Sequence, residues 1–284
     1  NSWWLSKKKG KEAWVRAAVE NGKIRYEVVH SADGPTGDDD GTVGRKGAIS
    51  LADGTPIDFA YMRSEACSGH MGAHLIAVVA ESDKGRVYIS PDAQQENIAL
   101  VNSPDNLPDS ALPQKALGFR VQAYGYTRWT DLFTNRQLVA LTTLSDLIGE
   151  AREKILADAL AAGMPEGERL EKGDTGAASY ADAVATYLAL AVSRQTNRLS
   201  SLNTWQNVGD KIAQVFTRQA IPMVWDYAEA NPFSHSTGNF LGQVEWVSKA
   251  IEHLPALSTS RADQISASAR DYGGLVVSTD PPYY

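Results

Sequence analysis

The longest regular pattern in the chain covers residues 131–162 and reads DLFTNRQLVALTTLSDLIGEAREKILADALAA. Leu, Ala, Glu and Lys are frequent in it, and its apolar residues recur at the spacing that places them on one face of an α-helix. Gly163 and Pro165 follow, and both residue types terminate helices. The stretch therefore predicts a long helix in the middle of the chain.

Three further helical regions are expected on the C-terminal side of this helix. They are preceded by a charged, glycine-containing connection over residues 165–178. The first of the three opens with a Ser-x-x-Asp start, formed by Ser179 and Asp182, and runs to about Leu199. The other two cover residues 210–229, where Pro222 forces a break or kink, and residues 240–253.

The first third of the chain is β-rich by the same criteria. Residues 23–30 carry apolar side chains near alternate positions, and residues 74–81 form a candidate buried strand. Residues 86–90 follow the turn signal Asp83-Lys84-Gly85, so the latter two strands are expected to form a hairpin. Two segments rich in Gly, Pro, Asp and Asn predict a loop and a linker: residues 34–47 and 91–113.

The pattern changes again near the C-terminal end. Residues 262–269 predict a short strand, and Tyr272-Gly273-Gly274 predicts a turn. Residues 275–279 (LVVST) form a continuous apolar run of the kind that parallel sheets bury on both faces. The predicted fold class is therefore α+β. Three parts are expected, over residues 1–115 (β-rich), 116–260 (helical) and 261–284 (two strands).

Composition places the chain among globular proteins. It has 284 residues, of which 43% are hydrophobic and 21% charged, and this excludes collagen-like, coiled-coil and wholly disordered classes. No apolar run approaches the roughly 20 residues that span a bilayer, and the first residues lack the apolar core of a signal peptide. We therefore expect a cytoplasmic protein with no membrane partner. Because residue 1 is Asn and the last residues form a stiff apolar motif, we also expect a fragment of a longer protein.

The net charge of −7 excludes a protein that coats nucleic acid, so any contact with DNA must be local. Candidate contacts are Lys7, Lys8, Lys9, Lys11, Arg45, Lys46 and Arg128. The alternative is that these are solvated surface charges. A cluster around Arg128 could stack on DNA or belong to a local core: Tyr124, Tyr126 and Trp129.

One part of the sequence has residues with the spacing of metal ligands. Cys67 is the single cysteine, which excludes an internal disulfide and a multi-cysteine zinc site. Cys67, His70 and His74 nevertheless have ligand-like spacing, and Glu65 or Asp53 could supply a fourth ligand. The alternative, an ordinary turn that enters a strand, is favoured, so no metal site is expected.

The C-terminal motif Asp280-Pro281-Pro282-Tyr283 carries the predicted chemistry. Ligands of doubly wound sheets bind outside the carboxyl ends of the strands, which is the position expected for Asp280. The Asp280 carboxylate and the Pro281 carbonyl are two acceptors on a stiff backbone, and together they suit an exocyclic amine. They would favour the tetrahedral form of that amine as it attacks. Tyr283 offers a ring face to a base that has left the duplex.

The stretch VVSTDPPYY (276–284) resembles the catalytic motif of amino-group DNA methyltransferases, specifically the adenine-N6 enzymes. Four further stretches look like the large adenine-specific DNA methylases with an embedded zinc ribbon: WWLSKKKG (3–10), GFRVQAYG (118–125), LFTNRQL (132–138) and MVWDYAEANPF (223–233). The resemblance covers nearly the whole chain. It implies that the C-terminal strands are the third and fourth of a Rossmann-like methyltransferase sheet. It also implies S-adenosylmethionine as cofactor, DNA as partner, and Asp280, Pro281, Pro282 and Tyr283 as catalytic residues.

The sequence departs from that family in three respects. The family's Phe-x-Gly-x-Gly loop for S-adenosylmethionine lies upstream of this region, and residues 68–72 (SGHMG) read as a turn instead. Residues 50–54 (SLADG) stand where a Cys-x-x-Cys-Gly knuckle would be, so zinc is not expected. Ser268 stands where the third strand often has an acidic residue beside the cofactor. We therefore expect the chain by itself to bind S-adenosylmethionine weakly or not at all.

Two interpretations stay open at this point. The first is an incomplete piece of an S-adenosylmethionine-dependent DNA adenine-N6 methyltransferase, inactive on its own. The second is a non-catalytic module that recognises DNA or another partner and carries a vestigial Asp-Pro-Pro-Tyr end. Three polar residues on or after an expected helix could contact cofactor or substrate, or could merely face solvent: Asp226, Glu229 and Asn231.

Overall fold

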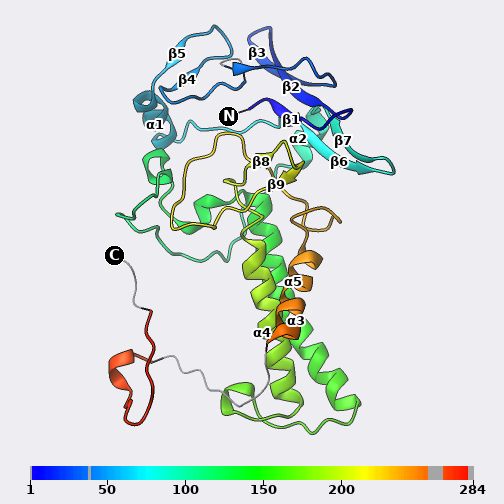
Figure 1. Cartoon of the computed structure of the whole chain (residues 1–284), viewed down its shortest axis with the longest axis vertical. Coiled ribbons are helices and arrows are strands. Elements are labelled where there is room, and N and C mark those ends of the chain that lie inside the picture. The colour runs from blue at the N-terminus through cyan, green and yellow to red at the C-terminus, as the bar shows by residue number, and fades with distance from the viewer. Residues whose placement is uncertain (1, 38–39, 255–264, 281–284) are drawn as a thin grey trace.

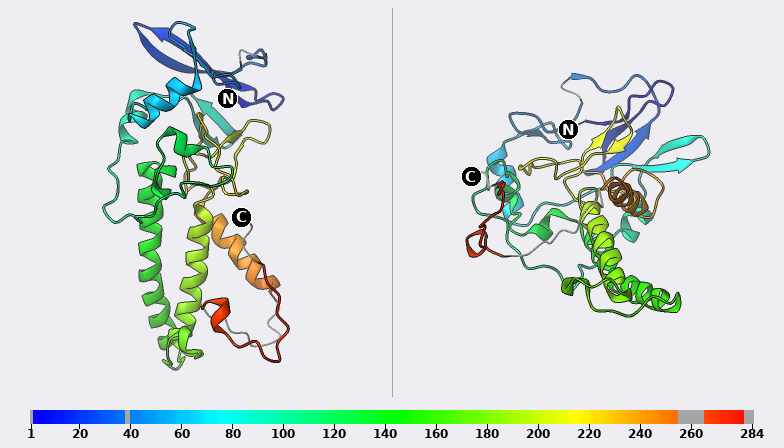
Figure 2. Two further views of the ribbon diagram at one scale, coloured as in Figure 1. Left: turned by 90° about the vertical axis from the view of Figure 1, so that its left-hand side faces the viewer. Right: turned by 60° about the horizontal axis from the view of Figure 1, so that its bottom comes forward.

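The structure, a computed structural model, describes residues 2–37, 40–254 and 265–280. The molecule is elongated, with small β-sheets at one end and a pair of long helices that project from them as a stalk (Figures 1 and 2). The strands are β1 (Trp4–Ser6), β2 (Ala13–Glu20), β3 (Lys23–Val29), β4 (Ala48–Ile49), β5 (Pro56–Ile57), β6 (Val78–Ser82), β7 (Gly85–Ile89), β8 (Trp205–Gln206) and β9 (Lys211–Ile212). The α-helices are α1 (Phe59–Cys67), α2 (Ala93–Ile98), α3 (Asn135–Ala161), α4 (Ala177–Gln195) and α5 (Phe240–His253). Short 3-10 turns are η2 (Val121–Tyr124), η3 (Trp129–Leu132), η4 (Leu170–Lys172) and η5 (Ala267–Ala269).

The β-rich end is built from hairpins. Strands β1, β2 and β3 form one antiparallel sheet, in which Glu20 pairs with Lys23 across the turn Asn21-Gly22. Both turn residues have positive φ, 52° and 73°, which is the backbone that a two-residue hairpin of type I′ requires. The strand expected over residues 23–30 is confirmed as β3, whereas β2 was missed although Asn-Gly is the strongest hairpin signal available.

The one hairpin predicted from the sequence is confirmed. Strand β6 pairs with β7 from Val78 opposite Ile89 to Ser82 opposite Gly85, so the first strand begins four residues later than expected. The expected linker over residues 91–113 contains a short helix, α2, whose Asp92 side chain accepts a hydrogen bond from the Gln95 amide at 2.8 Å. The loop expected over residues 34–47 contains no strand in its described part.

Helix α3 confirms the longest pattern in the sequence, but it starts at Asn135 because residues 129–132 form the 3-10 turn η3. Thr134 caps it: the Gln137 amide donates to the Thr134 hydroxyl at 3.3 Å and the Thr134 amide donates to Gln137 Oε1 at 2.9 Å. The helix ends before Gly163, whose φ of +86° is left-handed. Helix α5 matches its expected range, residues 240–253.

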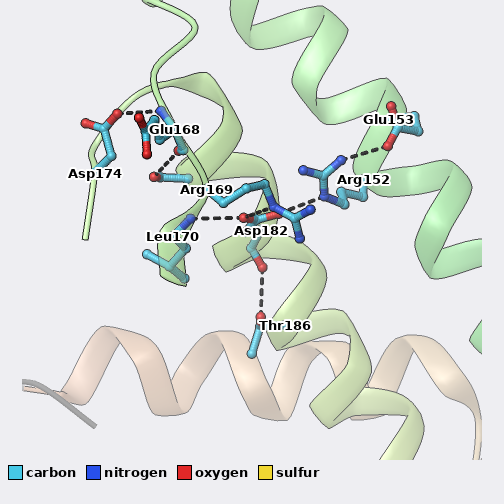
Figure 3. Close-up of polar contacts among 9 residues, drawn as sticks. Arg152, Glu153, Glu168, Arg169, Leu170, Asp174, Asp182 and Thr186 are labelled. Carbon is cyan, nitrogen blue, oxygen red and sulfur yellow. Dashed lines mark hydrogen bonds and ion pairs between the residues drawn. The ribbon is translucent and has the colours of Figure 1, made fainter. Parts of the chain in front are cut away.

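The second helix of the stalk begins two residues earlier than predicted and for a different reason. Gly176 is the N-cap of α4, and Ser179 lies inside the helix, where its hydroxyl donates to the Glu168 carbonyl at 2.8 Å. Asp182 is not part of a capping box. It lies between α3, α4 and the connection that joins them, and accepts hydrogen bonds from Arg152 Nε at 2.7 Å and Arg169 Nε at 2.6 Å (Figure 3).

The prediction of a helix over residues 210–229 is wrong. This segment contains strand β9 and irregular backbone, because its amides bond to distant carbonyls rather than to their own preceding turn. Asn203, fully buried, organises it. Its side-chain amide donates to the carbonyls of Asn197 and Ala213 at 3.0 and 2.7 Å, and its Oδ1 accepts from the Ser200 amide at 2.7 Å.

The irregular segment completes the larger hydrophobic core. Ile221 and Val224 are buried there against residues from η2, η3 and their surroundings. The buried members of this core are Leu112, Val121, Leu132, Leu202, Ile221 and Val224. A smaller core beneath the sheets contains Leu5, Ala13, Val15 and Tyr88. Trp205 packs against it, and its indole Nε1–H donates to the Leu5 carbonyl at 2.6 Å.

The predicted C-terminal strands are not formed in the described residues. Ala267–Ala269 is a 3-10 turn rather than part of a strand, and residues 275–280 are exposed and belong to neither helix nor strand. All four sheets of the described chain are antiparallel, so no Rossmann-like parallel sheet is present there. The physical reason is that a buried strand needs neighbours for its amides and carbonyls, and no described segment pairs with residues 275–279.

Within the described residues, no helix combines the length and the apolar composition that a membrane crossing demands.

Candidate nucleic-acid interface

A surface hollow of about 890 Å³ is lined by residues of α1 and by two other segments that are far apart in the sequence. Helix α1 is labelled in Figure 1. The first of the three segments comprises the loop before β4 together with α1, the second ends in η2, and the third crosses Pro222-Met223-Val224-Trp225. Its lining residues are Val43, Gly44, Arg45, Phe59, Arg63, Gln114, Lys115, Ala116, Phe119, Arg120, Gln122, Ala123, Tyr124, Pro222, Met223 and Trp225.

The charged side chains in the described lining are all positive. Arg45, Arg63, Lys115 and Arg120 line the hollow, and no Asp or Glu belongs to the described lining. All four cations are exposed, and within the described part of the chain none of them forms an ion pair. The whole chain carries a net charge of −7, so this cluster runs against the overall balance. Four unneutralised cations around one concave surface favour an anionic ligand.

Close approach of two backbones fixes one wall. The Arg120 amide donates to the Ile221 carbonyl at 2.9 Å, which joins the second and third segments. Gly118 has φ of +83°, and a Cβ there would lie 2.8 Å from the Ala220 Cβ. Only glycine adopts that backbone without strain and leaves that space empty.

A second glycine fixes the opposite side. Gly125 has φ of +85° and lies against the backbone of α1, where an added Cβ would be 3.3 Å from the Ala66 carbonyl oxygen. Cys67 Sγ, at the end of the same helix, contacts the Ala123 carbonyl at 3.6 Å. The two glycines therefore delimit the stretch 118–125, and each allows this stretch to pack closely on a neighbouring segment.

The side chains of residues 118–125 divide between core and hollow. Val121 is fully buried in the larger core, whereas its neighbours Arg120 and Gln122 line the hollow. The same division recurs in the third segment, where Val224 is buried and Trp225 lines the hollow. The core thus anchors both segments and directs the intervening side chains to the surface.

Aromatic rings line the hollow together with the cations, and we call Phe59, Phe119, Tyr124 and Trp225 its aromatic floor. Tyr124 is buried and meets Trp225 edge-on, with ring centroids 5.0 Å apart. Phe119 meets Trp129 edge-on at 6.1 Å. Phe59, Phe119 and Trp225 are only half-buried, so part of each ring faces the hollow. Edge-to-face packing is a favoured aromatic geometry and holds these rings in place.

Arg63 connects the charges with the rings. Its guanidinium carbon lies 5.8 Å from the Phe59 ring centroid and 5.7 Å from that of Tyr124. Phe59 and Arg63 are one helical turn apart in α1, so the helix itself brings them to one face. Arg63 therefore presents a flat, cationic surface beside the aromatic floor.

The cations predicted from the sequence lie elsewhere, except for Arg45. Lys7 is 3.8 Å from Asp40 and its ammonium lies 5.1 Å from the Trp4 ring centroid. Lys8 and Lys9 are exposed in the turn that leads from β1 towards β2. Arg128 forms an ion pair with Asp109 and does not line the hollow. Of the aromatic cluster around Arg128, Tyr124 belongs to the hollow, while Tyr126 packs on the larger core.

The structure describes only the first residue of the predicted catalytic motif. Asp280 lies in the exposed segment 275–280, and the rest of the motif, Pro281, Pro282 and Tyr283, lies outside the described residues. Ser268 is exposed in η5, and its hydroxyl is 2.9 Å from that of Ser266. That environment does not fit S-adenosylmethionine, because a cofactor of that size is held in a concave, largely buried site.

The side chains of the candidate metal ligands do not converge on one position. Cys67 contacts a carbonyl, His70 Nδ1 lies 3.0 Å from Glu65 Oε2, and His74 Nδ1 lies 4.0 Å from Glu96 Oε1. No group of three or more His, Cys, Asp or Glu side chains suited to a metal ion occurs among the described residues.

Two of the polar residues considered near cofactor or substrate, Glu229 and Asn231, make local contacts. Glu229 accepts hydrogen bonds from the Thr134 hydroxyl and from Arg136 Nε, the latter at 3.0 Å, so it ties the irregular segment to the start of α3. Asn231 Oδ1 accepts from the Phe233 amide at 2.9 Å and shapes its own turn. Neither residue lines the hollow.

Sequence reasoning missed Phe59, Arg63, Lys115 and Arg120 as site residues. The available signal was indirect: the stretches 118–125 and 223–233 carried the family resemblance, and both contribute to the lining of the hollow. The sequence offered no indication that α1 joins them.

Comparison with known proteins does not place the chain in a family: no family model matches it, no curated protein matches it, and no solved structure matches it.

Proposed function

We propose that this chain is the DNA-binding part of an adenine-specific DNA methyltransferase, and that the hollow beside α1 contacts DNA. The observation that carries the proposal is the lining of the hollow. Four cations and several aromatic rings line it without a carboxylate, in a chain whose net charge is negative. Phosphates supply most of the affinity of proteins for DNA, and Lys and Arg are the residues that neutralise them.

The resemblance supports the same proposal. Two of the four internal stretches that resemble adenine-specific DNA methylases meet at this hollow, although about a hundred residues separate them. Their glycines, core residues and exposed side chains serve one surface, which is the arrangement expected of a binding site. Adenine is proposed as the target because of the Asp-Pro-Pro-Tyr motif alone.

In this proposal the C-terminal motif acts on the target base. The Asp280 carboxylate and the Pro281 carbonyl accept hydrogen bonds from the exocyclic amine of adenine, and Tyr283 stacks on the extruded ring. The two acceptors favour the amine as it becomes tetrahedral. The second interpretation, a non-catalytic DNA- or partner-binding module with a vestigial motif, differs only in this step.

DNA binding is tested with a charge-matched pair of variants. Lys115→Gln combined with Arg120→Gln removes two cations from the hollow. Arg16→Gln combined with Arg25→Gln removes two cations from the β2–β3 hairpin, where they pair with Glu27 and Glu20. Fluorescence anisotropy with labelled DNA should give about a tenfold weaker affinity for the hollow variant only. The slope of log affinity against log salt should also fall by about 0.9 for each phosphate that the hollow variant no longer neutralises. Equal affinities of the two variants would refute the assignment of the hollow.

Catalysis is tested separately with Asp280→Ala in the full-length protein. Transfer of a labelled methyl group to adenine-containing DNA should fall about a hundred- to a thousandfold, because one aimed acceptor is removed from the reacting centre. DNA affinity should stay the same, since it depends on phosphate contacts elsewhere. Turnover close to that of the wild type, or no turnover by the wild type itself, would leave the non-catalytic interpretation.

A further inference from the structure

We infer that the hollow beside α1 accepts unpaired nucleotides of a DNA strand, with the bases on the aromatic floor and the phosphates on the surrounding cations. This inference rests on the proposed function, because it names the form of DNA that the same site takes. It concerns a site separate in sequence from the Asp-Pro-Pro-Tyr motif.

The hollow combines cations with aromatic rings. A site that only follows a duplex backbone needs cations, and Arg45, Lys115 and Arg120 would be sufficient. Half-buried rings at Phe59 and Trp225, which also line the hollow, add nothing to such a contact. Rings between cations are the arrangement by which proteins hold single strands, because each base offers a flat face for stacking.

A protein ring can reach the flat face of a base only where that face is open. In a duplex each base is covered above and below by its neighbours, so a protein ring cannot stack on it unless the base leaves the helix. In an unpaired strand the faces are open. The aromatic floor is therefore useful to the protein only when the bound nucleotide is unpaired.

The size and the rigidity of the hollow also fit a single nucleotide. The hollow measures about 890 Å³, which lies within the roughly 300–1,000 Å³ typical of pockets for small organic ligands. That volume accommodates a nucleotide but not a base-paired helix. Edge-on contact with Tyr124 holds Trp225, and the Arg63 guanidinium lies over the Phe59 ring, so the surface is organised before the ligand arrives.

The experiment compares three labelled probes of one length: a single DNA strand, the same strand paired as a duplex, and a single strand that keeps the sugar-phosphate backbone but lacks the bases. Phe59→Leu and Trp225→Leu remove the rings but keep apolar side chains, so folding is preserved better than with Ala. Phe59→Tyr and Trp225→Phe keep a ring. Trp246→Leu, on α5 and 62% exposed, removes a ring away from the hollow and is the control.

The single strand is expected to bind at least tenfold more tightly than the duplex. The two Leu variants should lose about five- to a hundredfold in affinity for the single strand, with no change for the abasic probe, and the ring-retaining variants should recover most of the loss. Trp246→Leu should bind like the wild type. Lys115→Gln should weaken all three probes, because every probe carries phosphates.

Two results would overturn the inference in distinguishable ways. Equal affinity for strand and duplex, with no effect of Phe59→Leu or Trp225→Leu, would refute the unpaired-nucleotide site while Lys115→Gln still shows DNA binding at the hollow. Absence of binding to all three probes by the wild-type protein would refute the proposed function as well.

Discussion

Replacing Asp182 by Asn is expected to destabilise the helical stalk, because Asp182 holds its parts together. Its Oδ1 accepts from Arg152 of α3, and its Oδ2 accepts from Arg169 and from the Leu170 amide of the connection (Figure 3). Its side chain is 10% exposed. Asn preserves the shape of the side chain but removes the negative charge that both guanidinium groups face.

The magnitude follows from the pKa of the Asp182 carboxyl. The hydrogen bond from Arg169, together with those from Leu170 and Arg152, lowers this pKa from 3.8 to about 2 despite the opposing effect of burial. At about 1.4 kcal/mol per pKa unit, the preferential stabilisation of the ionised form amounts to about 2 kcal/mol at neutral pH. Hydrogen bonds to charged groups contribute about 1.5–3 kcal/mol each, which agrees in order of magnitude.

The sign of the pH dependence is determined by the lowered pKa. Above the unfolded-state value of 3.8 the full stabilisation is present, and it is lost as the pH falls towards about 2. The difference in free energy of unfolding between wild type and Asp182→Asn should therefore be nearly constant from neutral pH to about pH 4 and fall to roughly half near pH 3.

Urea unfolding followed by far-ultraviolet circular dichroism measures this difference. Glu153→Gln is the control, because Glu153 also pairs with Arg152, at 2.7 Å, but is 70% exposed. An exposed ion pair contributes about 0–1 kcal/mol, so the control should change stability little. An Asp182→Asn protein as stable as the wild type at neutral pH, or a difference that does not shrink in acid, would refute the reasoning.

Two further substitutions test the backbone around the hollow. Gly118→Ala places a methyl group 2.8 Å from the Ala220 Cβ at a φ of +83° and should lower the free energy of unfolding in urea by about 1–3 kcal/mol. Gly10→Ala is the control, because Gly10 also has positive φ but nothing lies within 4 Å of an added Cβ, and it should lower this free energy less. Equal losses of stability in the two variants would contradict the close approach at Gly118. Asn203→Ala removes three hydrogen bonds from a fully buried site and should cost about 2–4 kcal/mol, whereas Asn106→Ala, at an exposed position, should be neutral in the same assay.

Local signals predicted some of the regular elements and missed others, among them β2, α1 and α2. The periodicity of α3, the range of α5 and the β6–β7 hairpin depend on residues within a few positions of one another. The helix prediction for residues 210–229 failed because this segment depends on residues that are distant in the sequence. Its apolar pattern is compatible with a helix, but Asn203 and distant carbonyls offer its backbone a different set of hydrogen bonds.

The C-terminal prediction failed because a strand is not a local structure. The apolar run at residues 275–279 is compatible with a buried strand, yet the described chain provides no neighbour to pair with it. The chemistry assigned to Asp280 therefore stays a prediction from the motif and the resemblance. The DNA contacts assigned to Lys7, Lys8, Lys9 and Arg128 stay predictions too, although Arg128 is already paired with Asp109.

The amino-acid sequence by itself determined the long helix α3, the helix α5, the β6–β7 hairpin and the absence of a cysteine framework, since these follow from local spacing and composition. The tertiary structure alone decided the location of the candidate site. Arg45 and Arg63 come from one segment of the lining and Arg120 comes from another, and they line one hollow because Gly125 lets the second segment pack closely on α1. Charge acts through space, so a net charge of −7 could not reveal that cations and aromatic rings line one hollow without a carboxylate in the described lining.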